Sequence, residues 1–128
     1  MCIRDSLRPG TSIDMYHKEI AKIMESELLD IKLIDKTDIK NQNPKNPAYK
    51  RYFMHGTSHH LGLDVHDVGN FYEDVKAGNV FTIEPGIYIK EESLGIRLED
   101  DILVGNNNNI NLMEKIPIQP EEIEDIMN

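Results

Sequence analysis

The clearest hydrophobic pattern lies near the start of the chain and is helical. Apolar side chains recur there at intervals of three and four residues, at Ile13, Tyr16, Ile20, Ile23, Met24 and Leu28. Thr11 or Ser12 can cap such a helix, and Asp14 places an acid in its first turn. The pattern therefore predicts an amphipathic helix over residues 12–30.

The next forty residues carry weaker signals. The polar, Asn-rich stretch 35–46 predicts a loop, and residues 46–53 predict a short second helix. Residues 54–69 contain four of the five histidines and three glycines. Because glycine disfavours a regular helix, strands and turns are expected in this stretch.

The second half of the chain predicts a β-hairpin. Residues 80–90 and 95–104 are rich in Val, Ile, Leu and aromatic residues, and the short polar stretch 91–94 connects them. The four asparagines at 106–109 are typical of a solvated turn, and Pro120, followed by two glutamates, predicts a terminal helix. The order of elements indicates an α+β fold.

Length and composition limit the possible functions. A chain of 128 residues fits one domain, and we take residues 7–128 as that domain, with 1–6 as a possible non-native leader. The net charge of −9 argues against duplex nucleic acid and anionic membranes as partners. The single cysteine, Cys2, excludes an internal disulfide and favours a reducing, cytoplasmic compartment. No apolar run approaches the ~20 residues that span a bilayer.

Two carboxylates stand out because they lie within the predicted hairpin strands. Glu84 precedes Pro85-Gly86, a pair that would direct a side chain as a β-bulge does. In the other strand the period of two places Ile96 and Leu98 on one face, with Arg97 and Glu99 on the opposite face. That polar face either lines a site or is a solvated side of the sheet, and the pattern alone fits both.

The histidines give the second chemical signal. His55, His59 and His66 lie close together in sequence near several glycines, whereas His17 on the amphipathic helix fits an ordinary structural role. Imidazole binds transition metals and transfers protons near neutral pH. One histidine with two glutamates suits a divalent ion or a bridged pair of ions. The residues thus predict a metal-assisted hydrolase.

Three segments, in this order, resemble the Xaa-Pro aminopeptidases (aminopeptidase P), members of the pita-bread metallopeptidases. They are MHGTSHHLGLDVHD at 54–67, TIEPGIY at 82–88 and GIRLEDD at 95–101. RPGT at 8–11 and PEEIE at 120–124 extend the resemblance over nearly the whole chain. It implies the C-terminal half of a pita-bread catalytic domain, with an antiparallel sheet covered by helices.

The resemblance also implies roles for individual residues. His59, Glu84 and Glu99 correspond to metal ligands, Glu99 bridging both ions and Glu84 also handling the proton of the attacking hydroxide. His55 and His66 correspond to site histidines that contact substrate and steady the tetrahedral intermediate. Arg97 corresponds to a supporting arginine near the bridging carboxylate, and no role is assigned to His60.

By the same resemblance, the full-length enzyme removes the N-terminal residue from peptides with proline in second position. It uses two divalent ions, for which carboxylate-rich ligation favours manganese, and a metal-bound hydroxide, and it is expected to be a homo-oligomer. The family's other two ligands are aspartates that precede the helix at 12–30. We therefore expect this chain to be a fragment that binds metal weakly and is inactive alone.

Two alternatives stay open. A prolidase, which cleaves only dipeptides, would share the same ligands. A non-catalytic binding module on the same fold would more often have lost at least one of His59, Glu84 and Glu99, all of which are retained here.

Overall fold

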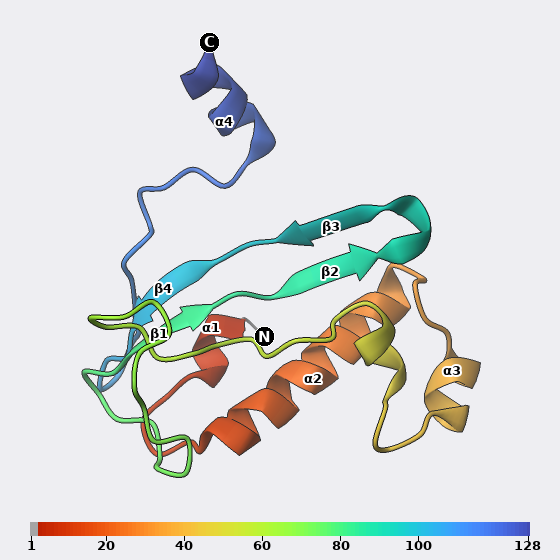
Figure 1. Ribbon diagram of the computed structural model, residues 1–128, viewed down its shortest axis with the longest axis horizontal. Helices are drawn as coiled ribbons and strands as arrows, with labels where there is room; N and C mark the ends of the chain where they lie inside the picture. The colour runs from red at the N-terminus through yellow and green to blue at the C-terminus, as the bar shows by residue number, and fades with distance from the viewer. Residues whose placement is uncertain (1–2) are drawn as a thin grey trace.

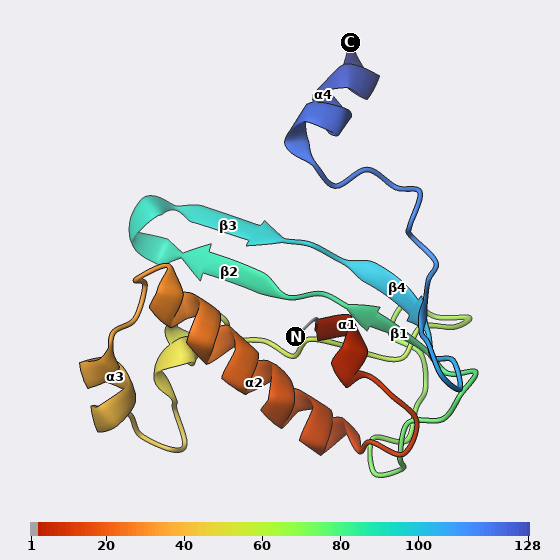
Figure 2. The same ribbon diagram turned by 180° about the vertical axis from the view of Figure 1, so that it is seen from behind.

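A computed structural model describes residues 3–128, and Met1 and Cys2, with the prediction about that cysteine, lie outside the described residues. A long helix lies along a long antiparallel ribbon, as both views show (Figures 1 and 2). The elements in chain order are α1 (Ile3–Ser6), α2 (Ile13–Asp30), α3 (Lys36–Asn41), the 3-10 turn η1 (Ala48–Arg51), β1 (Val80–Ile83), β2 (Gly86–Ile89), the 3-10 turn η2 (Lys90–Glu92), β3 (Leu94–Arg97), β4 (Asp100–Leu103), β5 (Ile110–Asn111) and α4 (Pro120–Met127).

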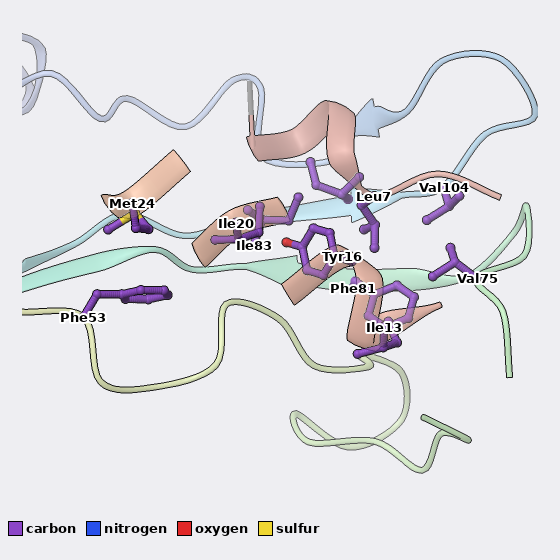
Figure 3. Close-up of a cluster of buried hydrophobic side chains, with 11 residues drawn as sticks. Leu7, Ile13, Tyr16, Ile20, Met24, Phe53, Val75, Phe81, Ile83 and Val104 are labelled. Carbon is purple, nitrogen blue, oxygen red and sulfur yellow. The ribbon is translucent and has the colours of Figure 1, made fainter. Parts of the chain in front are cut away.

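Helix α2 confirms the prediction for residues 12–30. The Ser12 side chain caps it by accepting a hydrogen bond from the Met15 amide at 3.2 Å. One side of the helix is buried, and its side chains meet residues from β1 and β4 in the core (Figure 3). The core comprises Leu7, Ile13, Tyr16, Ile20, Met24, Phe53, Val75, Phe81, Ile83, Ile102 and Val104. Burial of this apolar surface is the main force that holds the helix on the sheet.

The predicted hairpin is present, and each of its arms is divided into two strands. β1 pairs with β4 and β2 pairs with β3, and β5 adds a third strand beside β4. Both pairings share one register, and the Leu98 amide donates to the Pro85 carbonyl at 3.2 Å between them. Pro85-Gly86 lies at the break between the two strand pairs. Proline lacks an N–H and interrupts the ladder there, but no extra residue is inserted.

The two faces of the β2–β3 ribbon differ as the period of two predicts. Ile87 faces Ile96 across the strands, and with Leu98 they line an apolar groove of about 420 Å³ beside the end of α2. Arg97 belongs to the opposite face and reaches Glu84. The ribbon therefore has one apolar face and one face that carries the polar site residues.

The expectation of strands in residues 54–69 was wrong. This segment runs beside β1 and exchanges strand-like backbone hydrogen bonds with it, but the only β-pairing described there is an isolated bridge between His60 and Phe81. Two hydrogen bonds within the loop follow the pairing: the Asp67 amide donates to the His60 carbonyl, and the Gly62 amide donates to the Asp64 carbonyl. The segment is therefore a loop that the sheet edge holds in place.

The polar stretch 35–46 was also interpreted wrongly, because it contains the short helix α3. A capping box forms it: the Asp35 side chain accepts from the Asp38 amide, and the Asp38 side chain accepts from the Asp35 amide. The second helix predicted over residues 46–53 is reduced to the single 3-10 turn η1.

The two ends of the described chain behave differently. In the possible leader, Ile3 packs against the core and Ser6 is fully buried. At the other end α4 has Pro120 in its first turn, as predicted, and stands away from the body in both views (Figures 1 and 2). Within residues 3–128, no helix combines the length and the apolar character needed to cross a membrane.

Candidate active site

Backbone hydrogen bonds between the loop at residues 57–61 and β1 bring His59 to the end of that strand. The Glu84 amide donates to the Thr57 carbonyl at 2.7 Å, and the Thr82 amide donates to the His59 carbonyl at 3.0 Å. The His59 amide in turn donates to the Thr82 hydroxyl at 3.1 Å. These bonds fix the two backbones side by side, so that the His59 and Glu84 side chains emerge next to each other.

His59 and Glu84 form a nearly buried pair. His59 Nε2 lies 3.6 Å from Glu84 Oε1, and the two side chains are only 17% and 13% exposed. His59 Nδ1 donates to the His60 carbonyl at 2.9 Å, so Nε2 is the ring nitrogen that faces the Glu84 carboxylate. An imidazole oriented through its other nitrogen is the usual arrangement of a metal-binding histidine.

Arg97 lies on the other side of the same carboxylate. Its guanidinium lies 3.2 Å from Glu84 Oε2, while the Thr82 hydroxyl lies 3.5 Å from Oε1 and can donate to it. Glu84 thus has a positively charged partner on one oxygen and keeps the oxygen nearest His59 for another ligand or for a proton. The Arg97 side chain is 48% exposed and therefore reaches the site from the solvent side.

Glu99 is related to this group through the strand register. Continued through the break between the strand pairs, the register places Glu99 opposite Glu84, and residues opposite each other in an antiparallel pair share a face. Glu99 is nevertheless exposed. Among residues 3–128, no three His, Cys, Asp or Glu side chains come together closely enough to hold an ion.

The other four histidines differ in how they lie relative to the pair. The ring of His66, which is exposed, lies edge-on to that of His59 with 4.3 Å between centroids. His55 is held farther along β2, where its Nε2 lies 3.1 Å from the Tyr88 hydroxyl. His60 packs instead on the Phe81 ring, with centroids 4.2 Å apart. His17 lies away on α2, where burial lowers its pKa.

Two supporting groups were missed by the sequence reasoning. Thr82 is a polar residue in an otherwise apolar buried strand, and this is a signal that could have marked it. Ser58 and Tyr16 share a buried hydrogen bond of 2.7 Å between their hydroxyls, which ties the histidine loop to α2. No local pattern reveals that bond, because 42 positions separate the two residues.

The fold and the paired histidine and glutamate define a class of protein. The sequence profile of metallopeptidase family M24 matches residues 1–106, and the chain therefore belongs to that family. It is 42% identical to the Xaa-Pro aminopeptidase of Escherichia coli, over 94% of this chain and 30% of that protein. It is 37% identical to the Xaa-Pro aminopeptidase of Haemophilus influenzae, over 95% of this chain and 31% of that protein.

Solved structures of aminopeptidase P resemble this chain as well. Zinc-substituted aminopeptidase P of E. coli in complex with product matches 98% of this chain with a TM-score of 0.78 and 39% identity. Aminopeptidase PepP of Pseudomonas aeruginosa matches the same share with a TM-score of 0.81 and 31% identity. These matches confirm the pita-bread fold and the α+β class. In each case the chain spans about 31% of the matched structure's length.

Proposed function

We propose that this chain is the part of an Xaa-Pro aminopeptidase that supplies the histidine and two glutamate ligands of its metal site. The whole protein would remove the N-terminal residue from peptides with proline in second position. The observation that supports this most strongly is the His59–Glu84 pair, in which Nδ1 is held by a backbone carbonyl and Nε2 faces the carboxylate. The family membership gives the class of reaction.

The donor set fits a divalent ion in part. The His59 imidazole is a borderline ligand and the Glu84 carboxylate a hard one, and the two lie close together. Glu99 adds a second carboxylate from the opposite strand. Two ions, for which we propose manganese, would polarise the scissile carbonyl and make water a stronger nucleophile when bound. Within residues 3–128 these side chains do not come together as a complete site, and we propose that the rest of the full-length protein supplies the other ligands.

The chain's own residues have separate tasks in this proposal. Glu84 accepts the proton of the attacking water and delivers it to the leaving nitrogen, and Arg97 orients the carboxylate through its contact with Oε2. His55 and His66, the latter exposed beside His59, contact the substrate and steady the tetrahedral intermediate. From composition and resemblance we also propose a cytoplasmic location and a homo-oligomeric full-length protein.

A chimera tests the proposal. Residues 7–128 replace the segment that they match in the E. coli Xaa-Pro aminopeptidase, and hydrolysis of a proline tripeptide and of an Xaa-Pro dipeptide is measured with Mn²⁺. We expect turnover of the tripeptide, a loss of at least about a hundredfold in kcat for Glu84→Gln, and an unchanged rate for the control Glu91→Gln at the hairpin turn. Full turnover by the folded Glu84→Gln chimera would refute the role of Glu84.

The chain alone gives a second measurement. Calorimetric titration with Mn²⁺ should show weak binding that His59→Ala abolishes, and no peptide hydrolysis. Tight binding of two ions to the isolated chain would contradict the incomplete site. Cleavage of the dipeptide but not the tripeptide by the chimera would favour a prolidase.

A further inference from the structure

Tyr88 lies across the backbone of two glycines on the polar face of the ribbon. Gly95 is its cross-strand partner, and Gly86 is two positions earlier in the same strand, so all three residues share a face. A Cβ atom on Gly86 would come within 2.8 Å of the Tyr88 hydroxyl oxygen, and one on Gly95 within 2.7 Å of Tyr88 Cδ1. Any side chain at either position would therefore displace the ring.

The position of this ring determines what its hydroxyl reaches. The Tyr88 hydroxyl lies 3.1 Å from His55 Nε2, and the two rings meet edge-on with centroids 5.4 Å apart. The Phe53 ring meets the imidazole in the same way at 5.1 Å. His55 is thus held between two aromatic rings.

The hydrogen bonds of His55 settle which nitrogen carries its proton. Nδ1 lies 2.6 Å from the Gly56 carbonyl oxygen, and a carbonyl can only accept. Nδ1 must therefore be protonated. In the neutral ring Nε2 then has only a lone pair, and the Tyr88 hydroxyl donates to it.

We propose that Tyr88 is a positioning residue that, together with the Gly56 carbonyl, holds His55 in one tautomer and one orientation, and that Gly86 and Gly95 provide the space in which its ring lies. The importance of this for catalysis rests on the proposed function. A substrate group that bonds to His55 Nε2 has to displace the Tyr88 hydroxyl, so Tyr88 sets how readily His55 engages a substrate.

Nitrogen-15 NMR of the imidazole rings in the 128-residue chain tests the proposal directly, with His55→Asn used to assign the signals. At a pH of about 8.5, where imidazole is neutral, we expect His55 to be the Nδ1–H tautomer. Tyr88→Phe removes only the hydroxyl and should shift the ring toward the Nε2–H form. Gly95→Ala keeps the hydroxyl but displaces it, and should have the same effect. Tyr72→Phe, in a side chain that is 98% exposed, is the control and should change nothing.

An Nε2–H tautomer in the unaltered chain would overturn the proposal, even if a variant failed to fold. An unchanged Nδ1–H signal in folded Tyr88→Phe would do the same. The readout needs neither metal nor peptidase activity. An inactive chimera with the expected tautomer would therefore count against the proposed function alone, and an active chimera with the wrong tautomer against the role of Tyr88 alone.

Discussion

Glu84 and Arg97 meet across the break in the ribbon, with 3.2 Å between the guanidinium and Oε2. The two residues have unequal surroundings: the Glu84 side chain is 13% exposed, and that of Arg97 is 48% exposed. Loss of the ion pair should therefore destabilise the nearly buried Glu84 carboxylate more than the half-exposed Arg97 guanidinium, which water can still solvate. A largely desolvated charge that loses its partner costs more than an exposed one.

This inequality predicts the effect of Arg97→Gln. The substitution leaves the Glu84 carboxylate without a cation, and we expect it to lower the free energy of unfolding by about 1–2 kcal/mol, measured by urea denaturation. Arg51→Gln is the matched control, because Arg51 pairs with Asp38 at 3.3 Å in a more exposed setting. We expect it to cost about 0.5 kcal/mol or less. Equal losses in the two variants would show that Glu84 is solvated well enough without Arg97.

Tyr16 predicts a loss of stability at alkaline pH. Burial raises the pKa of its phenol from 10.0 to about 12, and the hydrogen bond with Ser58 offsets part of that rise. The unfolded chain therefore loses this proton first. The contribution is fully present below pH 10.0 and is lost as the pH rises through about 12. A two-unit shift corresponds to about 2–3 kcal/mol.

The stability of the chain and of Tyr16→Phe, measured by urea denaturation between these pH values, checks this prediction. The wild-type chain should lose its advantage over the variant as the pH rises, because the variant has no phenol to ionise. Absorbance of tyrosinate should also show that one late-titrating tyrosine of the wild type is missing from the variant. A difference in stability that does not change with pH would contradict the prediction.

Asn109 holds the turn after β4 to the start of the chain. Its Nδ2 donates to the Leu7 carbonyl at 2.6 Å and to the Arg4 carbonyl at 2.9 Å. Asn109→Ala removes both donors, and we expect a loss of about 1–3 kcal/mol in thermal or urea unfolding. The control is Asn107→Ala, which is exposed and should change stability by about 0.5 kcal/mol or less. If both variants were as stable as the wild type, the two Asn109 hydrogen bonds would contribute nothing to stability, and the turn would be a solvated connection, as its composition suggests.

The sequence alone predicted the elements whose patterns lie within one short segment. The long helix follows from its apolar period and cap, and the hairpin from two β-rich stretches and a short turn. The capping box of α3 was also present in the sequence, as Asp35 and Asp38 three positions apart. It was missed because the many asparagines of this stretch favoured a loop.

The site was predictable only in part, because its geometry depends on distant pairing. The opposition of Glu84 and Glu99 follows from the hairpin register, which a short turn nearly determines. The approach of His59 to Glu84 depends on backbone bonds between a loop and a strand more than 20 positions away. Neither segment carries a periodic pattern that specifies those bonds, so residue type could indicate the chemistry but not the contact.

Gly105 shows how closely the chain approaches itself in the turn after β4. A Cβ atom there would lie 1.9 Å from the Asn108 carbonyl oxygen, which is backbone and cannot rotate away as a side chain could. Gly105→Ala should therefore force the turn open and lower the unfolding free energy by about 2 kcal/mol or more. At Gly56 an added Cβ meets nothing within 4 Å, so Gly56→Ala is the control and should be neutral or slightly stabilising. Urea denaturation of both variants provides the test, and a Gly105→Ala variant as stable as Gly56→Ala would mean that the turn can move without loss.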